Sequence, residues 1–132
     1  KHYSKTLIKN IKIANNKWKK THLNSIKSAY GSSPFFIYYF EDIKDIINTN
    51  HVFLIDLNNE ILNYFLNEMK IRIKIKKTEK YIKDYPMDVL DFRDRNKENN
   101  RIYQQVFSEN FIPNLSILDL IFNAGPNARE YI

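Results

Sequence analysis

The sequence predicts a predominantly helical α+β domain, with four to five helices and two to three short strands. The 132 residues are 43% hydrophobic and 14% aromatic, which is enough for one core at the usual ~100–200 residues per domain. Glycine occurs only twice, which disfavours an all-β protein built on many tight turns. Apolar residues recur with helical spacing along most of the chain and alternate with polar ones in only two short stretches.

The N-terminal half predicts one short strand and three helices. Residues 7–13 (LIKNIKI) alternate weakly, which indicates a strand. A first helix follows, which Asn15 or Asn16 can cap and Gly31 can end. A second helix begins near Pro34, with Ser32 or Ser33 before it. The third helix lies within residues 52–70, where Leu54, Leu57, Ile61, Phe65 and Met69 form an apolar stripe.

The C-terminal half predicts one more strand and one more helix. Residues 71–78 (IRIKIKKT) alternate strictly, which is typical of a half-buried strand. Residues 94–101 are expected to form an exposed loop, and residues 102–111 fit either a helix or a strand. Residues 111–128 (FIPNLSILDLIFNAGPNA) predict a last helix, bounded by proline before it and Gly-Pro after it.

Several classes of site are excluded by composition. There is no glycine-rich phosphate loop and no cysteine, so a disulfide, a thiolate metal site and a thiol nucleophile are absent from this chain. The three histidines, His2, His22 and His51, lack metal-ligand spacing, and we predict no metal site. No apolar run approaches the ~18 residues of a membrane span, and no secretory signal is visible. The sequence identifies no cofactor.

The net charge of +6 raises the question of a nucleic-acid partner. The chain is also rich in isoleucine, lysine and asparagine, which AT-rich codons encode, so mutational bias can raise the charge without any polyanionic partner. The two lysine clusters, at residues 17–20 and 74–77, have the spacing of solvated faces. We therefore expect no nucleic-acid partner.

Three places in the sequence could carry chemistry. His22 shares a helical stripe with Trp18, which suits either a general base or a core histidine. Asp91 and Arg93 would point the same way in an extended stretch, where they could pair with each other, bind a ligand or remain surface charges.

Asp119 lies in the middle of the most apolar helix. Ser116 and Asp119 fit the S-x-x-[DE] pattern of a capping box, in which Ser116 caps the helix and Asp119 bonds back to its backbone N–H. A carboxylate in such a helix must be hydrogen-bonded or have a shifted pKa. The pattern predicts a helix cap, with a functional site as the alternative.

Four blocks of the sequence together resemble the WbqC-like protein family. They are residues 17–39 (KW…H…I…AY…SPFF…Y), 91–93 (DFR), 103–107 (Y-x-QVF) and the C-terminal block from residue 111. The resemblance runs from about Ile11 to the last residue, and its C-terminal block is the most specific part. The family's pattern normally begins earlier, so we expect residues 1–132 to form a single WbqC-like domain without the family's N-terminal region.

The resemblance implies a function. Members of the family are often encoded in bacterial O-antigen and surface-polysaccharide gene clusters. That context implies a cytoplasmic transferase that places an acyl or aminoacyl group on the amine of a nucleotide-linked sugar. The family's characteristic polar positions correspond here to His22, Tyr30, Asp91, Arg93, Tyr103, Gln105, Asn114, Ser116 and Asp119.

These positions suggest roles for the transferase. His22 would act as base, and Asp91 or Asp119 would orient its ring as carboxylates do in triads. Arg93 would bind a phosphate or carboxylate of the substrate. The remaining substrate contacts would come from Tyr30, Tyr103, Gln105 and Asn114.

A non-enzymatic protein-binding or structural module is the alternative. Residues Phe35 to Phe40 are six consecutive apolar or aromatic side chains, which must be buried or form a contact surface. They would then form a partner or homodimer surface, and the polar positions would be internal hydrogen-bond anchors.

Overall fold

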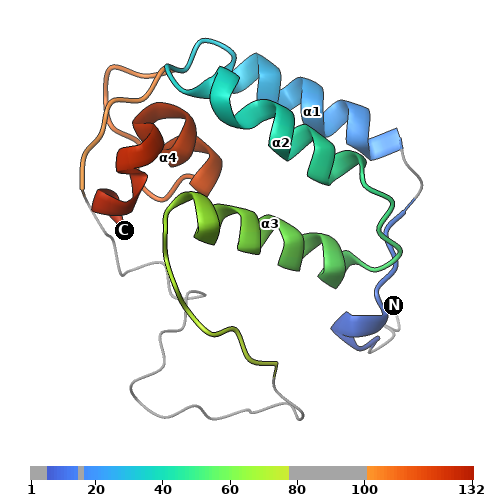
Figure 1. The fold of residues 1–132 in the computed structure, drawn as a ribbon. Coiled ribbons are helices and arrows are strands. Elements are labelled where there is room, and N and C mark those ends of the chain that lie inside the picture. The colour runs from blue at the N-terminus through green and yellow to red at the C-terminus, as the bar shows by residue number, and fades with distance from the viewer. Residues whose placement is uncertain (1–5, 15–16, 78–100) are drawn as a thin grey trace.

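Helices make up the regular structure of the part of the chain that the computed structural model describes, residues 6–14, 17–77 and 101–132 (Figure 1). The α-helices are α1 (Lys17–Tyr30), α2 (Phe36–Asn48), α3 (Leu54–Glu68) and α4 (Ile117–Ala124). The 3-10 helices are η1 (Ile8–Asn10) and η2 (Gly125–Tyr131).

Helix α2 is the centre of the arrangement, because it contacts α1, α3 and α4. A short connection of residues 31–35 returns the chain from α1, so α1 and α2 lie side by side in opposite directions (Figure 1). Helix α3 covers another face of α2. Helix α4 and η2 pack together at the end of the bundle where α1 finishes and α2 begins.

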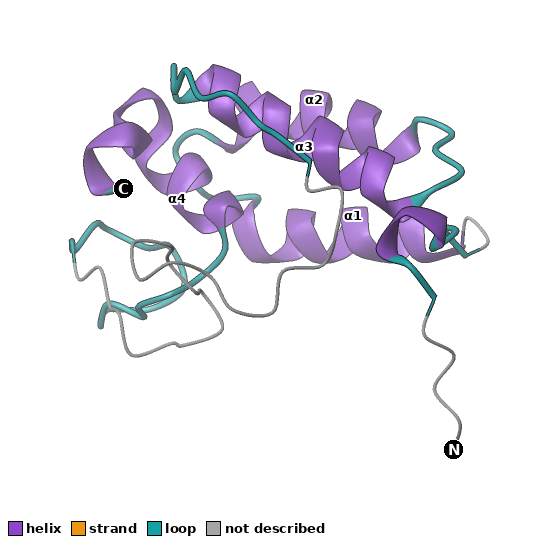
Figure 2. Ribbon diagram, turned by 90° about the horizontal axis from the view of Figure 1, so that it is seen from below, coloured by secondary structure: helices purple, strands orange, loops and turns teal. Residues whose placement is uncertain are grey.

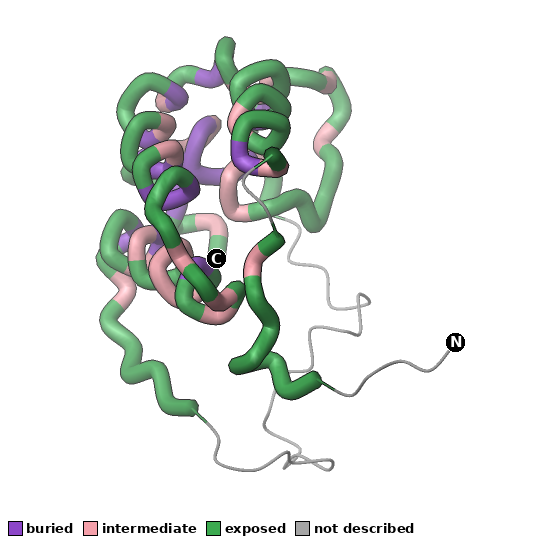
Figure 3. The backbone as a smooth tube through the Cα atoms, turned by 90° about the vertical axis from the view of Figure 1, so that its right-hand side faces the viewer, coloured by how far each residue is buried: buried purple, intermediate pink, exposed green. Residues whose placement is uncertain are grey.

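The hydrophobic core lies between these helices, where the buried residues gather (Figure 3). The buried residues of α2 recur at intervals of three and four, which places them on one face of the helix. All of them except Ile46 meet Ile26 of α1, Phe65 of α3 and Phe122 of α4 in one cluster. Burying each such side chain contributes about 1.5–3 kcal/mol, so apolar periodicity positions the helices. The residues of α2 on this face are Phe36, Tyr39, Ile43, Ile46 and Ile47.

The predicted α+β fold with two to three strands is wrong, because the described part of the chain contains no strand (Figure 2). The predicted strand at residues 7–13 begins as η1, in which the Asn10 N–H donates to the Leu7 carbonyl at 2.8 Å. It then makes one isolated antiparallel bridge, between Lys12 and Phe53. Residues 71–77 contain no strand and form no β-bridge with another described segment.

The two predicted strands do not form because neither segment has a neighbouring strand among the described residues with which to pair. The bridge at Lys12 cannot lengthen, because its partner segment turns into α3 at Leu54. Alternation at residues 71–77 does not correspond to a buried face, since Ile73 is 61% exposed and Ile75 44% exposed. Alternation shows which side chains can face one way, but a strand also needs a neighbour for its backbone groups.

The helix predictions are largely confirmed. Helix α1 ends at Tyr30, and the Gly31 N–H donates to the Lys27 carbonyl at 2.9 Å. The two asparagines predicted to cap α1 lie outside the described residues. The aromatic segment Phe35 to Phe40 is divided, because Phe36 and Tyr39 enter the core while Ile37 and Tyr38 stay 74% and 68% exposed.

Candidate functional site

Asp119 lies fully buried in α4, with 0% of its surface exposed. The helix begins at Ile117. Ser116 is its N-cap, and the Ser116 hydroxyl accepts a hydrogen bond from the Leu118 N–H at 3.1 Å, so the predicted cap is confirmed at that residue. The Asp119 carboxylate has other partners. It accepts hydrogen bonds from the Tyr103 hydroxyl at 2.6 Å, the Gln105 amide at 2.8 Å and the Asn123 amide at 3.1 Å.

All three partners of this carboxylate are hydrogen-bond donors, which is the set that an ionised carboxylate can satisfy. Among the described residues, no lysine, arginine or histidine forms a salt bridge with it. A buried negative charge is stable only where such donors surround it. We call Tyr103, Gln105, Asp119 and Asn123 the Asp119 cluster.

Gln105 connects the cluster to the backbone of the segment before α4. Its side-chain carbonyl accepts from the Ile112 N–H at 2.8 Å, and its amide donates to the Ile112 carbonyl at 3.0 Å. The same amide donates to Asp119. One buried glutamine therefore closes the loop of residues 105–112 and holds it against α4.

Tyr103 and Tyr30 both lie in the field of Asp119. Burial raises the pKa of Tyr103 far above its ordinary value, and the hydrogen bond to Asp119 raises it further. Burial also raises the pKa of Tyr30, with a second contribution from the charge of Asp119. Both phenols are therefore neutral donors at physiological pH.

A hollow of about 780 Å³ opens beside the cluster, lined by residues 102–109 and Phe111. Tyr103 and Phe111 also line a smaller hollow of about 300 Å³, which includes Arg101 and Asn114. Asn114 has a φ of 58°, a left-handed conformation that asparagine tolerates well. Tyr103 thus has its hydroxyl bonded to the buried carboxylate while its side chain borders open space on two sides.

His22 lies in a different place. Its ring packs edge-on against Trp18, with 5.5 Å between the ring centroids, and it lines an apolar pocket of about 370 Å³ formed with Leu57 and Ile61 of α3. No residue of that pocket is a hydrogen-bond partner of Asp119. His22 precedes Tyr30 by eight residues on α1, which corresponds to about 12 Å along the helix.

The structure therefore brings together four of the predicted site residues, Tyr30, Tyr103, Gln105 and Asp119, with Asn114 at the neighbouring hollow. It does not bring His22 to them. Asp91 and Arg93 lie outside the described residues, so their predicted roles remain predictions.

Comparison with protein families supports the resemblance. The sequence profile of the WbqC-like protein family matches residues 1–92 and 87–131, two overlapping segments that span nearly the whole chain. The chain belongs to the WbqC-like protein family. Comparison with curated proteins and with solved structures gave no significant match.

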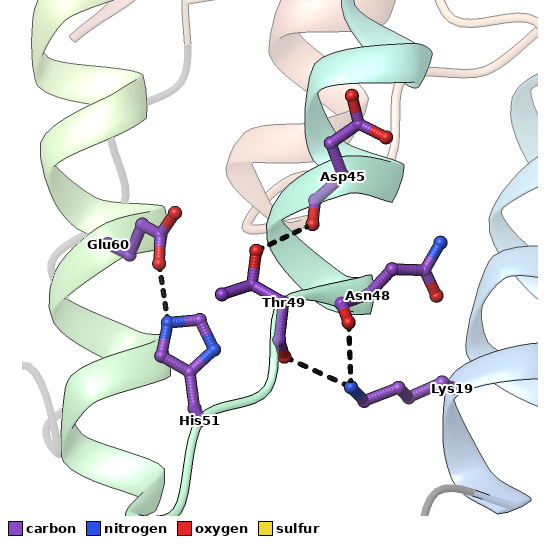
Figure 4. A network of polar contacts seen from close by, with 6 residues as sticks. All are labelled: Lys19, Asp45, Asn48, Thr49, His51 and Glu60. Atoms are coloured by element: carbon purple, nitrogen blue, oxygen red, sulfur yellow. Dashed lines mark hydrogen bonds and ion pairs between the residues drawn. The ribbon is translucent and has the colours of Figure 1, made fainter.

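A second polar network in this WbqC-like chain ties α1 and α3 to the end of α2 (Figure 4). Lys19 is only 9% exposed, and its ammonium donates to the carbonyls of Asn48 at 3.1 Å and Thr49 at 3.0 Å. His51 and Glu60 form a pair at 2.5 Å that joins the following loop to α3. The lysine cluster at residues 17–20 was expected to be a solvated face, but Lys19 is the exception because it caps the carbonyl end of α2.

Two features are absent from the part of the chain that the structure describes. Within residues 6–14, 17–77 and 101–132, no group of three or more histidine, aspartate or glutamate side chains is placed to hold a metal ion. Over the same residues, no helix combines the length and the apolar character needed to cross a membrane.

Asn123 is the cluster member that the sequence predictions missed. Its amide also donates to the backbone carbonyl of Asp119 at 2.8 Å. Residues four apart on a helix are neighbours, so the spacing of Asp119 and Asn123 was a usable signal. Asp119 is buried and Asn123 is half-buried, so this pair places polar groups on the inward side of α4, whereas the cap at Ser116 is exposed.

Proposed function

We propose that this WbqC-like chain transfers an acyl or aminoacyl group to the amine of a nucleotide-linked amino sugar, and that the transfer takes place in the hollow beside Tyr103. The observation that carries the proposal is the 2.6 Å hydrogen bond from the Tyr103 hydroxyl to the fully buried Asp119. Family membership supports the substrate class, through the polysaccharide context that the family resemblance implies. A cytoplasmic location belongs to the same proposal.

The geometry suits proton transfer through a tyrosine. The proton of Tyr103 is already directed at Asp119, so the phenol oxygen has lone pairs left to accept a hydrogen bond from a bound amine. The pKa of Tyr103 is raised, so the phenol starts the reaction neutral and works as a relay rather than as a free base. Tyr30, whose pKa is also raised, offers a second neutral hydroxyl to the sugar.

The transfer step balances as follows. The amine nitrogen attacks the carbonyl carbon of an activated acyl donor, a C–N bond forms, and the bond to the leaving group breaks with its electron pair on the leaving group. The amine proton passes to the Tyr103 oxygen as the Tyr103 proton passes to Asp119. Asp119 then returns its proton to the Tyr103 oxygen as Tyr103 passes one proton to the leaving group. This restores the pair, and the products are an amide and the protonated leaving group.

Arg93 and Asp91 keep supporting roles in the proposal, whereas His22 belongs to an alternative site. Arg93 would bind a phosphate of the nucleotide, and Asp91 would hold that guanidinium in place. His22 as the base is an alternative site for the same reaction, in the apolar pocket beside Trp18. If the reaction takes place beside Tyr103, substitution of Tyr103 should lower activity and substitution of His22 should not. If it takes place in the pocket beside Trp18, the reverse is expected.

The test is a transfer assay read by mass spectrometry, with nucleotide-linked amino sugars and activated acyl donors. Tyr103→Phe should lower kcat by about 10²-fold or more, because it removes the relay but keeps the ring. Tyr38→Phe is the matched control, since Tyr38 is 68% exposed on α2, and should not change kcat. A folded Tyr103→Phe protein with full activity would overturn the site.

Two further variants keep the test decisive. Tyr30→Phe keeps the ring contacts of Tyr30 with Phe107 and Phe122 and should lower activity less than Tyr103→Phe does. If Tyr103→Phe folds poorly, the activity of Tyr30→Phe still tests whether the site lies beside Tyr103. His22→Ala should leave kcat nearly unchanged, and loss of activity without loss of melting temperature would move the chemistry to the Trp18 pocket.

A non-enzymatic module is the second candidate, and one observation favours it. Ile37 and Tyr38 project from α2 with 74% and 68% of their surfaces exposed, next to a helix face that is otherwise core. A homodimer or partner contact would bury them. Light scattering on the wild-type protein and an Ile37→Lys variant tests this: a dimer that dissociates on substitution favours the module, and a monomer in both cases removes it.

A further inference from the structure

A groove of about 630 Å³ runs between α1 and α2, separate from the hollow beside Tyr103. Its α1 wall includes Lys20, Leu23 and Lys27, and its α2 wall includes Phe40 and Lys44. The residues on each wall are spaced by three or four, which is the spacing of one helix face. Its volume is within the ~300–1,000 Å³ typical of ligand sites.

The groove carries an excess of positive charge, with four lysines and one glutamate in its lining. Lys19 is committed to the carbonyls of Asn48 and Thr49. Lys44 pairs with Glu41 at 2.5 Å, but both side chains are well exposed, so the pair is weak and open to exchange. Lys20 and Lys27 are exposed and have no ion pair within the described part of the chain.

These two lysines define the kind of ligand. They are seven residues apart on one face of α1, about 10 Å along the helix axis, so their flexible ammonium groups can converge on one anion between them. The bond of Lys19 to the last carbonyls of α2 also removes the negative helix end that would otherwise repel an anion. The groove therefore favours a compact group with two or more negative charges.

The lining offers a second type of contact beside the charges. Phe40 and Leu23 supply an apolar surface, and the ring of Phe40 is held by stacking on Phe36 with centroids 4.5 Å apart. The side-chain amides of Asn24 and Asn48 lie along the same groove and can bond to polar ring edges. We infer that this groove binds a nucleoside diphosphate, with its phosphates at Lys20, Lys27 and Lys44 and its base against Phe40.

The position of the groove relates it to the transfer site. Lys27 is one helical turn before Tyr30, whose ring packs on Phe107 of the Tyr103 hollow with centroids 5.5 Å apart. The groove would then hold the nucleotide half of the substrate while the sugar half extends past Tyr30. This assignment rests on the proposed function, but binding of the nucleotide is measurable without any transfer.

The test is calorimetric titration of the whole chain with uridine diphosphate and adenosine diphosphate, alongside uridine and inorganic pyrophosphate. Lys20→Glu/Lys27→Glu should weaken diphosphate binding by at least about tenfold. Lys74→Glu/Lys76→Glu is the matched control, because it makes the same change in net charge on exposed residues outside the groove and should change the Kd by less than about twofold. Phe40→Leu should weaken both nucleotides but leave pyrophosphate unchanged.

Three results would overturn the groove assignment. The first is that neither nucleotide binds. The second is that the Lys74→Glu/Lys76→Glu control weakens nucleotide binding as much as the groove variant does. The third is that a short RNA binds more tightly than either nucleotide and loses its affinity in the groove variant. The last result would make the groove a nucleic-acid surface.

Tyr103→Phe separates this inference from the proposed function. Loss of transfer with normal nucleotide binding in that variant supports both proposals. Normal nucleotide binding with unchanged transfer removes only the proposed Tyr103 site. The groove assignment alone is rejected in a third case. There, Tyr103→Phe abolishes transfer, but the Lys20→Glu/Lys27→Glu variant still binds nucleotide normally.

Discussion

The bundle of α1, α2 and α3 and the C-terminal segment of residues 101–132 are stabilised in different ways. Apolar side chains at helical spacing join the three helices, and Lys19 and His51 make polar ties at one end. In the C-terminal segment, a short helix brings a charged carboxylate into the interior, where side-chain donors satisfy it. Apolar burial has no direction, whereas a buried carboxylate requires particular partners at particular distances. The helix bundle should therefore tolerate shape-conserving substitutions that the C-terminal segment does not.

Asp119→Asn tests this contrast with the largest expected effect. The substitution keeps the shape but replaces one acceptor oxygen with a donor, which then faces the donors of Tyr103, Gln105 or Asn123. The free energy of unfolding in urea should fall by about 4 kcal/mol, since two or more buried groups lose a partner at ~1–3 kcal/mol each. Ile43→Leu in α2 is the matched control and should cost less than about 1.5 kcal/mol. Equal costs for the two variants would remove the distinction between the regions.

Gly125→Ala probes the junction of α4 and η2. Gly125 has a φ of 55°, and an added Cβ would lie 2.5 Å from the ring of Phe35. Backbone strain and overpacking should together lower the free energy of unfolding by about 3 kcal/mol. Phe35→Leu in the same chain should restore about 1 kcal/mol by removing the clash but not the strain. Strict additivity of the two substitutions would show that the ring does not limit this turn.

The two regions also differ in how far the sequence predicts them. Apolar spacing located α1, α2 and α3, because burying one face of each helix is enough to define them. The same spacing cannot say what a polar residue contacts. Ser116 was identified as a cap because capping is local, whereas the partners of Asp119 come from Tyr103 and Gln105, which are 16 and 14 residues away.

The candidate site was predicted only in part, because local patterns in the sequence do not reveal contacts between distant residues. Family resemblance pointed to Tyr30, Tyr103, Gln105 and Asp119, and the structure brings these residues together. The expectation that Asp119 orients His22 depended on a tertiary contact that no local pattern encodes. The strands failed in the same way, since pairing depends on a neighbouring segment rather than on alternation within one.

Lys19→Met asks whether the helix bundle also depends on a specific polar group. The methionine keeps an apolar stem of similar length but leaves the carbonyls of Asn48 and Thr49 without the ammonium. The free energy of unfolding should fall by about 1–2 kcal/mol, because the two carbonyls at the end of α2 keep some access to water. Lys20→Met is the control on the neighbouring exposed lysine and should change it by less than about 0.5 kcal/mol. A loss as large as that of Asp119→Asn would mean that both regions depend on a buried charge.

Alkaline pH gives the smallest and most selective test. The pKa of Tyr103 is raised by burial and by Asp119, and the pKa of Tyr64 is raised by burial and by Asp42, so each region contains one phenol whose pKa lies far above its ordinary value. A group whose pKa is higher in the folded protein contributes stability that is complete below its unfolded pKa and is lost as the pH rises toward its folded pKa. The free energy of unfolding should therefore be level up to the ordinary tyrosine pKa of 10.0 and decrease above it.

Substitution of each phenol should remove its own share of that decrease. A full shift is worth about 1.4 kcal/mol per pH unit, and solvent screening of these partly exposed rings reduces the share of each to about 0.5 kcal/mol between about pH 9 and about pH 11. Tyr103→Phe and Tyr64→Phe should each flatten the alkaline decrease by that amount, and the double variant should flatten it by the sum, because the two rings lie in separate networks. Urea unfolding at a series of pH values measures this. Strong non-additivity in the double variant would show that the bundle and the C-terminal segment unfold as one electrostatic unit rather than as the two regions distinguished above.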